Sequence, residues 1–106
     1  MNFFEAMLTR FGEDPQIDVM IEEMSELTKG LLKYRRKRNF PDYKPETYLA
    51  EYRTRIREEM ADVLIMLKQM QQLFGPDLCF DEFLRKLAEK QEFFKDKLKD
   101  TWDGYT

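Results

Sequence analysis

Apolar residues recur along most of the chain at the spacing of an α-helix. From residue 17 to 31 they fall at steps of three and four, at Ile17, Met20, Ile21, Met24, Leu27 and Leu31. Similar series cover residues 49–70 and 80–98. Each series forms one stripe on an amphipathic helix. We therefore expect an all-α fold of four helices, the first of them short and ending at Gly12.

Turn and capping residues set the expected boundaries of the next two helices. Pro15, preceded by Asp14 as N-cap, suits the first turn of a second helix that reaches residues 34–38. Two prolines interrupt residues 39–45, so this stretch is expected to be a connection. The third helix is expected over residues 46–74, because glycine and proline follow it.

The fourth helix is expected from about residue 80, with Asp81 as a cap, to about residue 100. We expect residues 101–106 to be a tail, and residues 1–106 to be a single domain. Gly30 lies inside the second helix, where glycine costs about 1 kcal/mol relative to alanine. A close helix crossing would explain it, but the sequence alone does not show one.

Composition narrows the class of protein. The chain has 106 residues, 42% hydrophobic and 37% charged, which suits a soluble helical domain. A chain this short buries a small core alone, so pairing with another copy would help to stabilise it. The net charge of −3 argues against nucleic acid as a partner. With one cysteine, no bilayer-spanning apolar run and no signal-peptide pattern, we expect a cytoplasmic protein without a membrane partner.

The absence of histidine limits the possible chemistry. It excludes Ser-His-Asp and Cys-His nucleophile systems, as well as zinc or di-iron sites built on histidine ligands. Catalysis would have to use carboxylates, lysines, arginines, tyrosines or a metal.

Two acidic motifs, Glu22-Glu23-Met-Ser-Glu26 and Glu58-Glu59-Met-Ala-Asp62, lie in the expected second and third helices. At about 100° per residue, the second and last acids of each motif lie roughly 80° and 140° from the apolar stripe. If the two helices pack antiparallel, equal offsets turn these acids to one edge of the pair. That edge would carry Glu23, Glu26, Glu59 and Asp62. The first acid of each motif points further away.

Four carboxylates along one edge repel each other unless a cation lies between them. Oxygen ligands without nitrogen or sulfur select hard divalent ions, and Mg²⁺ in an open groove shares its shell with substrate phosphates. We therefore predict a Mg²⁺ site at Glu23, Glu26, Glu59 and Asp62, which Mn²⁺ could also occupy. The alternative is a plain solvated face on a non-enzymatic helical interaction module, since 21 acidic residues make chance clusters common.

These motifs, in this order on consecutive helices and with their apolar neighbours over roughly residues 16–67, resemble the MazG-like nucleoside triphosphate pyrophosphohydrolases. The resemblance implies a four-helix all-α bundle that works as a dimer or a dimer of dimers. It implies cleavage of an NTP or dNTP between the α- and β-phosphates, giving the monophosphate and pyrophosphate. The four acids fall on the metal-ligand positions of the family, and Glu22 or Glu23 is the candidate general base.

The stretch between the motifs is longer than in the most compact members of the family, which leaves the preferred base open. A dUTP- or dCTP-selective enzyme, or a phosphoribosyl-ATP pyrophosphatase, is an alternative with the same fold.

Phosphate and base contacts are expected on the same helices. Lys33 follows Glu26 by seven residues and so lies on nearly the same side of its helix. The resemblance implies phosphate-binding basic residues on the last helix, for which Lys86 and Lys90 are the best matches. The asparagine often found in this stretch of the family is not clearly present, and Gln91 is the nearest candidate for a base contact. Gln16, in phase with Glu23, is another candidate base contact. Aromatic candidates for a base slot are Phe40, Tyr43, Tyr48 and Trp102. For any single one of these residues, a solvated face or a packing contact is the alternative.

Overall fold

The computed structural model describes residues 1–39 and 46–104, with side chains for all of these except residues 46–48. It contains α1 (Phe3–Phe11), α2 (Glu13–Asn39), α3 (Glu46–Phe74) and α4 (Pro76–Phe94). No strand occurs in this part of the chain, which confirms the all-α prediction with four helices. The connection predicted at residues 40–45, with Phe40 and Tyr43, lies outside the described residues, as does the side chain of Tyr48.

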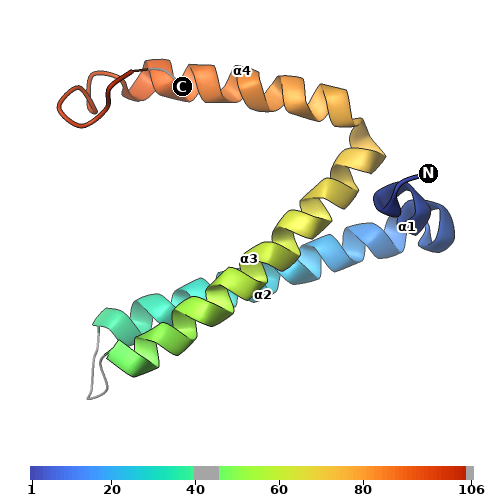
Figure 1. The fold of residues 1–106 in the computed structure, drawn as a ribbon, viewed down its shortest axis with the longest axis horizontal. Coiled ribbons are helices and arrows are strands. Elements are labelled where there is room, and N and C mark those ends of the chain that lie inside the picture. Colours follow the sequence, from blue (N-terminus) through green and yellow to red (C-terminus); the bar gives the residue numbers. More distant parts are fainter. Residues whose placement is uncertain (40–45, 105–106) are drawn as a thin grey trace. The chain divides into compact units, whose positions relative to one another are not determined.

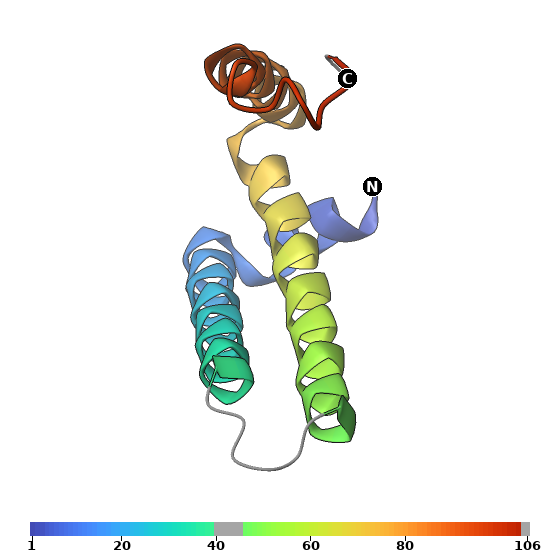
Figure 2. The same cartoon turned by 90° about the vertical axis from the view of Figure 1, so that its left-hand side faces the viewer.

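The chain forms two compact units, Met1–Leu73 and Phe74–Thr106. In the first unit, α2 and α3 run side by side in opposite directions, as both views show (Figures 1 and 2). The antiparallel pair that the acidic motifs require is therefore present. The short helix α1 lies beside the beginning of α2.

Both ends of α1 carry specific capping interactions. The Asn2 side chain accepts a hydrogen bond from the Glu5 amide at 2.8 Å and donates one to the Glu5 carboxylate at 3.1 Å. The first of these bonds satisfies a backbone donor that the first turn of a helix leaves open. At the other end, Gly12 adopts a positive φ of 88° and donates its N–H to the Leu8 carbonyl at 2.9 Å. The predicted stop at Gly12 is confirmed.

The buried part of the first unit is small and partly polar. Met20 is 6% exposed, and the amide side chains of Gln16 and Gln69 are 5% and 2% exposed. Gln69, on α3, donates from Nε2 to the backbone carbonyl of Phe4 at 2.7 Å. Since a buried amide without a partner would be costly, this bond attaches α1 to α3.

Helix α4 begins and ends earlier than predicted. Pro76 takes the first helical position directly after Gly75, whose φ of 99° suits glycine, and the Cys79 amide bonds the Gly75 carbonyl. Proline has the right φ for this position and lacks only an N–H that would be unpaired there. Asp81 is therefore inside the helix and does not cap it.

After Phe94 the chain continues in turns through residue 101. Hydrogen bonds between residues three apart mix there with bonds between residues four apart: the Phe94 carbonyl accepts from the Lys97 amide at 3.0 Å and from the Leu98 amide at 3.1 Å. The predicted helix end near residue 100 is therefore about six residues too late.

Most large apolar side chains of the described residues remain exposed. Met20 is the only buried hydrophobic residue among them, and α4 has no buried residue. The exposed stripes of α2, α3 and α4 include Ile21, Met24, Leu31, Met60, Leu64, Leu67, Phe80, Phe83 and Leu84. Within the described chain, no helix has both the length and the apolar character required to cross a bilayer.

Candidate functional site

The acids predicted to face the α2/α3 seam differ from their neighbours in burial. Glu23 and Glu59 are half-buried, whereas Glu22 and Glu58 are exposed. This difference agrees with the helical phase of the motifs. The last acids, Glu26 and Asp62, are exposed as well, so each helix contributes one partly covered and one accessible carboxylate. We call Glu23, Glu26, Glu59 and Asp62 the acidic edge.

Glu23 is the electrostatic centre of the acidic edge. Its pKa is raised above the ordinary value of 4.5, first by loss of solvation and then by the negative charge of Asp62. Glu22, Glu26 and Glu59 raise the pKa further in the same direction. Carboxylates from both helices therefore act on one side chain, and removing a proton from Glu23 costs more than it would in water.

Gly30 provides the space that the Glu59 carboxylate occupies. A Cβ atom built on Gly30 would collide with Glu59 Oε2 and would lie 3.3 Å from the Glu59 carboxyl carbon. The same oxygen is buried and has no hydrogen-bond partner among the described residues. A close approach between α2 and α3 thus explains the glycine inside α2, where the sequence alone gave no reason for it.

Gly30 also lies on the acidic side of α2. It follows Glu26 by four residues and Glu23 by seven, which places it within about 20–40° of both around the helix. The Glu59 carboxylate is therefore about one helical turn from Glu26 along α2. The carboxylate of Glu59 on α3 therefore lies against the side of α2 that carries Glu23 and Glu26, in agreement with the helical phase of the motifs.

The donors of the acidic edge suit a hard divalent cation, because all of them are carboxylate oxygens. The buried oxygen of Glu59 is an acceptor that no group in the described part of the chain pairs with, and a cation would satisfy it. Among the described residues, however, no three His, Cys, Asp or Glu side chains come close enough together to hold a metal ion. The chemistry of the edge therefore fits Mg²⁺ or Mn²⁺, while a closed ligand cluster is not assembled in this structure.

One lysine that the sequence analysis did not single out contacts the edge. Lys29 Nζ lies 3.7 Å from Glu26 Oε1, with both side chains largely exposed. An exposed ion pair of this kind contributes little stability, so Glu26 is not firmly held by it. The i, i+3 spacing on one helix was the signal that could have found this pair.

The predicted phosphate and base contacts are distributed over both units. Lys33 is exposed on α2, and Lys86 and Lys90 are exposed on α4. Gln16 is buried in the first unit. Lys90 and Gln91 line a pocket of the second unit together with Trp102, so three residues singled out from the sequence come together there.

A cation–aromatic cluster joins α2 and α3 near the basic end of α2. Arg53 on α3 donates from Nε to the Tyr34 hydroxyl at 3.3 Å, and its guanidinium carbon lies 5.8 Å from the Tyr34 ring centre. The Arg38 guanidinium carbon lies 5.7 Å from the same ring centre. Arg38 is four residues after Tyr34, a spacing that predicts contact on a helix, whereas the sequence does not predict the contact with Arg53.

Comparisons with models of protein families, with curated proteins and with solved structures found no significant match to this chain. The resemblance of the two acidic motifs to the MazG-like enzymes therefore rests on the motif residues and their placement on α2 and α3.

Proposed function

We propose that the chain is a Mg²⁺-dependent nucleotide pyrophosphohydrolase that cleaves an NTP or dNTP between the α- and β-phosphates. The observation that carries the proposal is the position of the Glu59 carboxylate. It lies against Gly30 on the side of α2 that carries Glu23 and Glu26, and one of its oxygens is buried without a hydrogen-bond partner among the described residues. The resemblance of both motifs to the MazG-like family adds the reaction.

Each acid has a role in this proposal. Glu23, Glu26, Glu59 and Asp62 would hold Mg²⁺ or Mn²⁺, which when bound offsets the negative charge of the phosphates. Glu23 is also the better-placed general base, because its raised pKa makes it a stronger proton acceptor than an ordinary carboxylate. Glu22 is exposed and acts on Glu23 through its charge.

The basic residues would contact the triphosphate. Lys33 is one helical turn beyond Gly30 on α2, and its ammonium group can reach an anion held at the acidic edge. For Lys86 and Lys90, which belong to the second unit, the proposed role as phosphate contacts rests on the resemblance to the family alone. Gln16 and Gln91 remain the proposed base contacts, and the preferred base stays open.

A second copy of the chain is part of the proposal. A chain that buries only Met20 among its described hydrophobic residues leaves the apolar stripes of its helices in water. Symmetric pairing of identical chains covers such stripes most simply. Analytical ultracentrifugation should show a dimer or a tetramer, and a monomer at micromolar concentration would contradict this part of the proposal.

The reaction is tested by product analysis. The purified chain is incubated with Mg²⁺ and each NTP and dNTP, with dUTP, dCTP and phosphoribosyl-ATP included, and the products are separated. Monophosphate and pyrophosphate are expected, and activity should fall at least a hundredfold in Glu59→Gln and Asp62→Asn. Glu51→Gln, an exposed acid elsewhere on α3, is the matched control. A diphosphate and orthophosphate as products, or full activity of both variants, would refute the proposal.

The extent of exposed apolar surface favours a second candidate, a non-enzymatic helical interaction module. In that case the acidic edge is a solvated face, and divalent metal would not change the stability of the protein. Absence of hydrolysis for every nucleotide, together with no thermal stabilisation by Mg²⁺ or Mn²⁺, would support this second function.

A further inference from the structure

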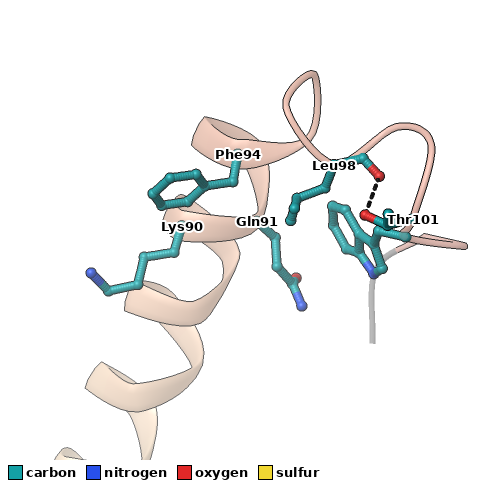
Figure 3. A pocket seen from close by; sticks show the side chains of 6 residues that line it. Lys90, Gln91, Phe94, Leu98 and Thr101 are labelled. Atoms are coloured by element: carbon teal, nitrogen blue, oxygen red, sulfur yellow. Dashed lines mark hydrogen bonds between the residues drawn. The ribbon is translucent and has the colours of Figure 1, made fainter. Parts of the chain in front are cut away.

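The second unit contains a pocket of about 440 Å³, a size that suits a small organic ligand. The residues that line it come from the end of α4 and the turns that follow (Figure 3). They are Lys90, Gln91, Phe94, Leu98, Thr101 and Trp102. The pocket lies wholly within residues 74–106, and the acidic edge contributes nothing to it.

The pocket exists because the chain turns back after α4. The Leu98 carbonyl accepts hydrogen bonds from the Thr101 amide at 2.9 Å, the Trp102 amide at 2.8 Å and the Thr101 hydroxyl at 3.2 Å. Three donors on one carbonyl hold the turn closed. They keep Thr101 and Trp102 next to Leu98, so residues 101 and 102 form a wall of the pocket.

The lining combines flat apolar walls with one charge. Phe94, Leu98 and Trp102 offer aromatic and aliphatic surface, whereas Lys90 is the only charged residue of the lining and none of the six is acidic. The ammonium group of Lys97 adds positive charge nearby, 5.7 Å from the Phe94 ring centre. Aromatic walls select planar rings, and a lysine at the rim selects an anion.

We propose that this pocket binds a small ligand that combines a planar aromatic ring with a negative charge. Two classes share this chemistry, nucleoside monophosphates and aromatic carboxylates. In both, the ring lies against Phe94 and Trp102, and the anionic group pairs with Lys90. The site shares Lys90 with the phosphate contacts of the proposed function. It goes beyond the hydrolysis because it requires neither a divalent metal nor any residue of the acidic edge.

The experiment uses Trp102, the only tryptophan of the chain, as a reporter inside the pocket. The full-length chain in EDTA is titrated with AMP, phenylacetate, adenosine and inorganic phosphate while tryptophan emission is recorded. AMP or phenylacetate should change the emission saturably, and the tighter of the two identifies the natural class. Adenosine, which lacks the charge, should bind about tenfold more weakly, and phosphate alone should have no effect.

Two variants test the two halves of the recognition. Lys90→Met keeps the length of the side chain and should weaken AMP and phenylacetate about tenfold, to the affinity of the neutral ligand. Phe94→Leu should weaken every ring-containing ligand about fivefold or more, because base–aromatic stacking contributes this much. Lys68→Met, at an exposed position of α3, removes the same charge elsewhere and should bind like the unmodified chain.

Three results would overturn the proposal. The first is a tryptophan emission that no aromatic anion changes, and the second is saturation of the emission change by phosphate alone. The third is an equal affinity of Lys90→Met and the unmodified chain for AMP. Because EDTA removes divalent metal, a failure here leaves the roles of the acidic edge intact and bears only on Lys90 as a phosphate contact. Loss of hydrolysis in an acidic-edge variant, in turn, does not predict loss of this binding.

Discussion

The carboxylate of Glu59 occupies the space that a side chain at position 30 would need. Gly30 and Glu59 lie on different helices, so the missing side chain at position 30 leaves room for the Glu59 carboxylate between α2 and α3 near the acidic edge. The glycine costs α2 about 1 kcal/mol in helix propensity relative to alanine. Its presence is understandable if the position of Glu59 matters more to the protein than that stability.

Gly30→Ala should therefore separate stability from metal binding. The atom that the new methyl group meets is the end of a flexible side chain, which can move away at little cost. We expect the free energy of unfolding without metal to stay equal or rise by up to about 1 kcal/mol. The Glu59 carboxylate moves, so Mg²⁺ affinity should fall about tenfold, as measured by thermal shift across a Mg²⁺ series.

A matched control for Gly30→Ala is Thr28→Ala. Thr28 is exposed on the same helix, and its hydroxyl donates to the Met24 carbonyl of that helix at 2.9 Å. This variant raises helix propensity without placing an atom near Glu59, and it should keep full Mg²⁺ affinity. Equal Mg²⁺ affinity of both alanine variants would show that the contact between positions 30 and 59 does not position a ligand.

Glu23→Gln should stabilise the metal-free protein at neutral pH. Because folding raises the pKa of Glu23 above 4.5, its contribution to stability is full below that pH. It is lost as the pH rises through the folded-state value. Glutamine carries no charge at any pH, so Glu23→Gln does not lose this stability when the pH rises. Since like charges cost a few tenths of a kcal/mol per pair, about 0.5 kcal/mol or 2–4 °C in Tm is expected at pH 7.

The pH series provides the check on Glu23. Tm is measured from pH 4 to 8 in EDTA for the unmodified chain, for Glu23→Gln and for Glu51→Gln. The advantage of Glu23→Gln should shrink towards pH 4 and grow above pH 5, whereas Glu51→Gln should follow the unmodified chain. A lower Tm for Glu23→Gln at pH 7 would mean that the other carboxylates do not oppose its charge.

Divalent metal should stabilise the folded chain if the acidic edge holds it. A cation at ten times its Kd contributes about 1.4 kcal/mol, or about 5–10 °C in Tm for a domain of this size. Mg²⁺ and Mn²⁺ should both act, and Asp62→Asn should abolish the shift. Glu51→Gln is again the control, and an unchanged shift in Asp62→Asn would exclude Asp62 as a ligand.

Tyr34 should contribute to stability through both its ring and its hydroxyl. Tyr34→Phe removes the hydrogen bond from Arg53 and should cost about 0.5–1 kcal/mol. Tyr34→Leu also removes the aromatic face next to Arg38 and Arg53, which should cost about 0.5–1 kcal/mol more. Urea unfolding of the two variants measures both steps, and equal stability of Phe and Leu variants would show that the ring face contributes nothing.

The helices could be predicted from the sequence, because apolar spacing and capping residues are local signals. The predicted stop at Gly12 and the span of α3 agree with the structure. The start of α4 did not, because Gly75 and Pro76 are helix breakers when they follow a helix and good starting residues when they precede one. Only the surrounding structure decides between these two readings.

The candidate site was predictable to a smaller extent. Helical phase places acids of both motifs on one edge of the helix pair. The observed burial agrees with this prediction, because Glu23 and Glu59 are half-buried whereas Glu22 and Glu58 are exposed. The contact between Gly30 and Glu59 depends on how far two helices slide along each other. So does the pairing of Arg53 with Tyr34. No local pattern of residues encodes that displacement.

The hydrogen bond from Gln69 to the Phe4 carbonyl has a consequence for the order of folding. It joins residues 65 positions apart, so the chain must close a long loop before this bond can form, at an entropic cost that rises with loop length. Helix α1, only 9 residues long, is too short to persist alone in water. We therefore expect α1 to dock last and to open first, so its amides should lose hydrogen-exchange protection before those in the middle of α3.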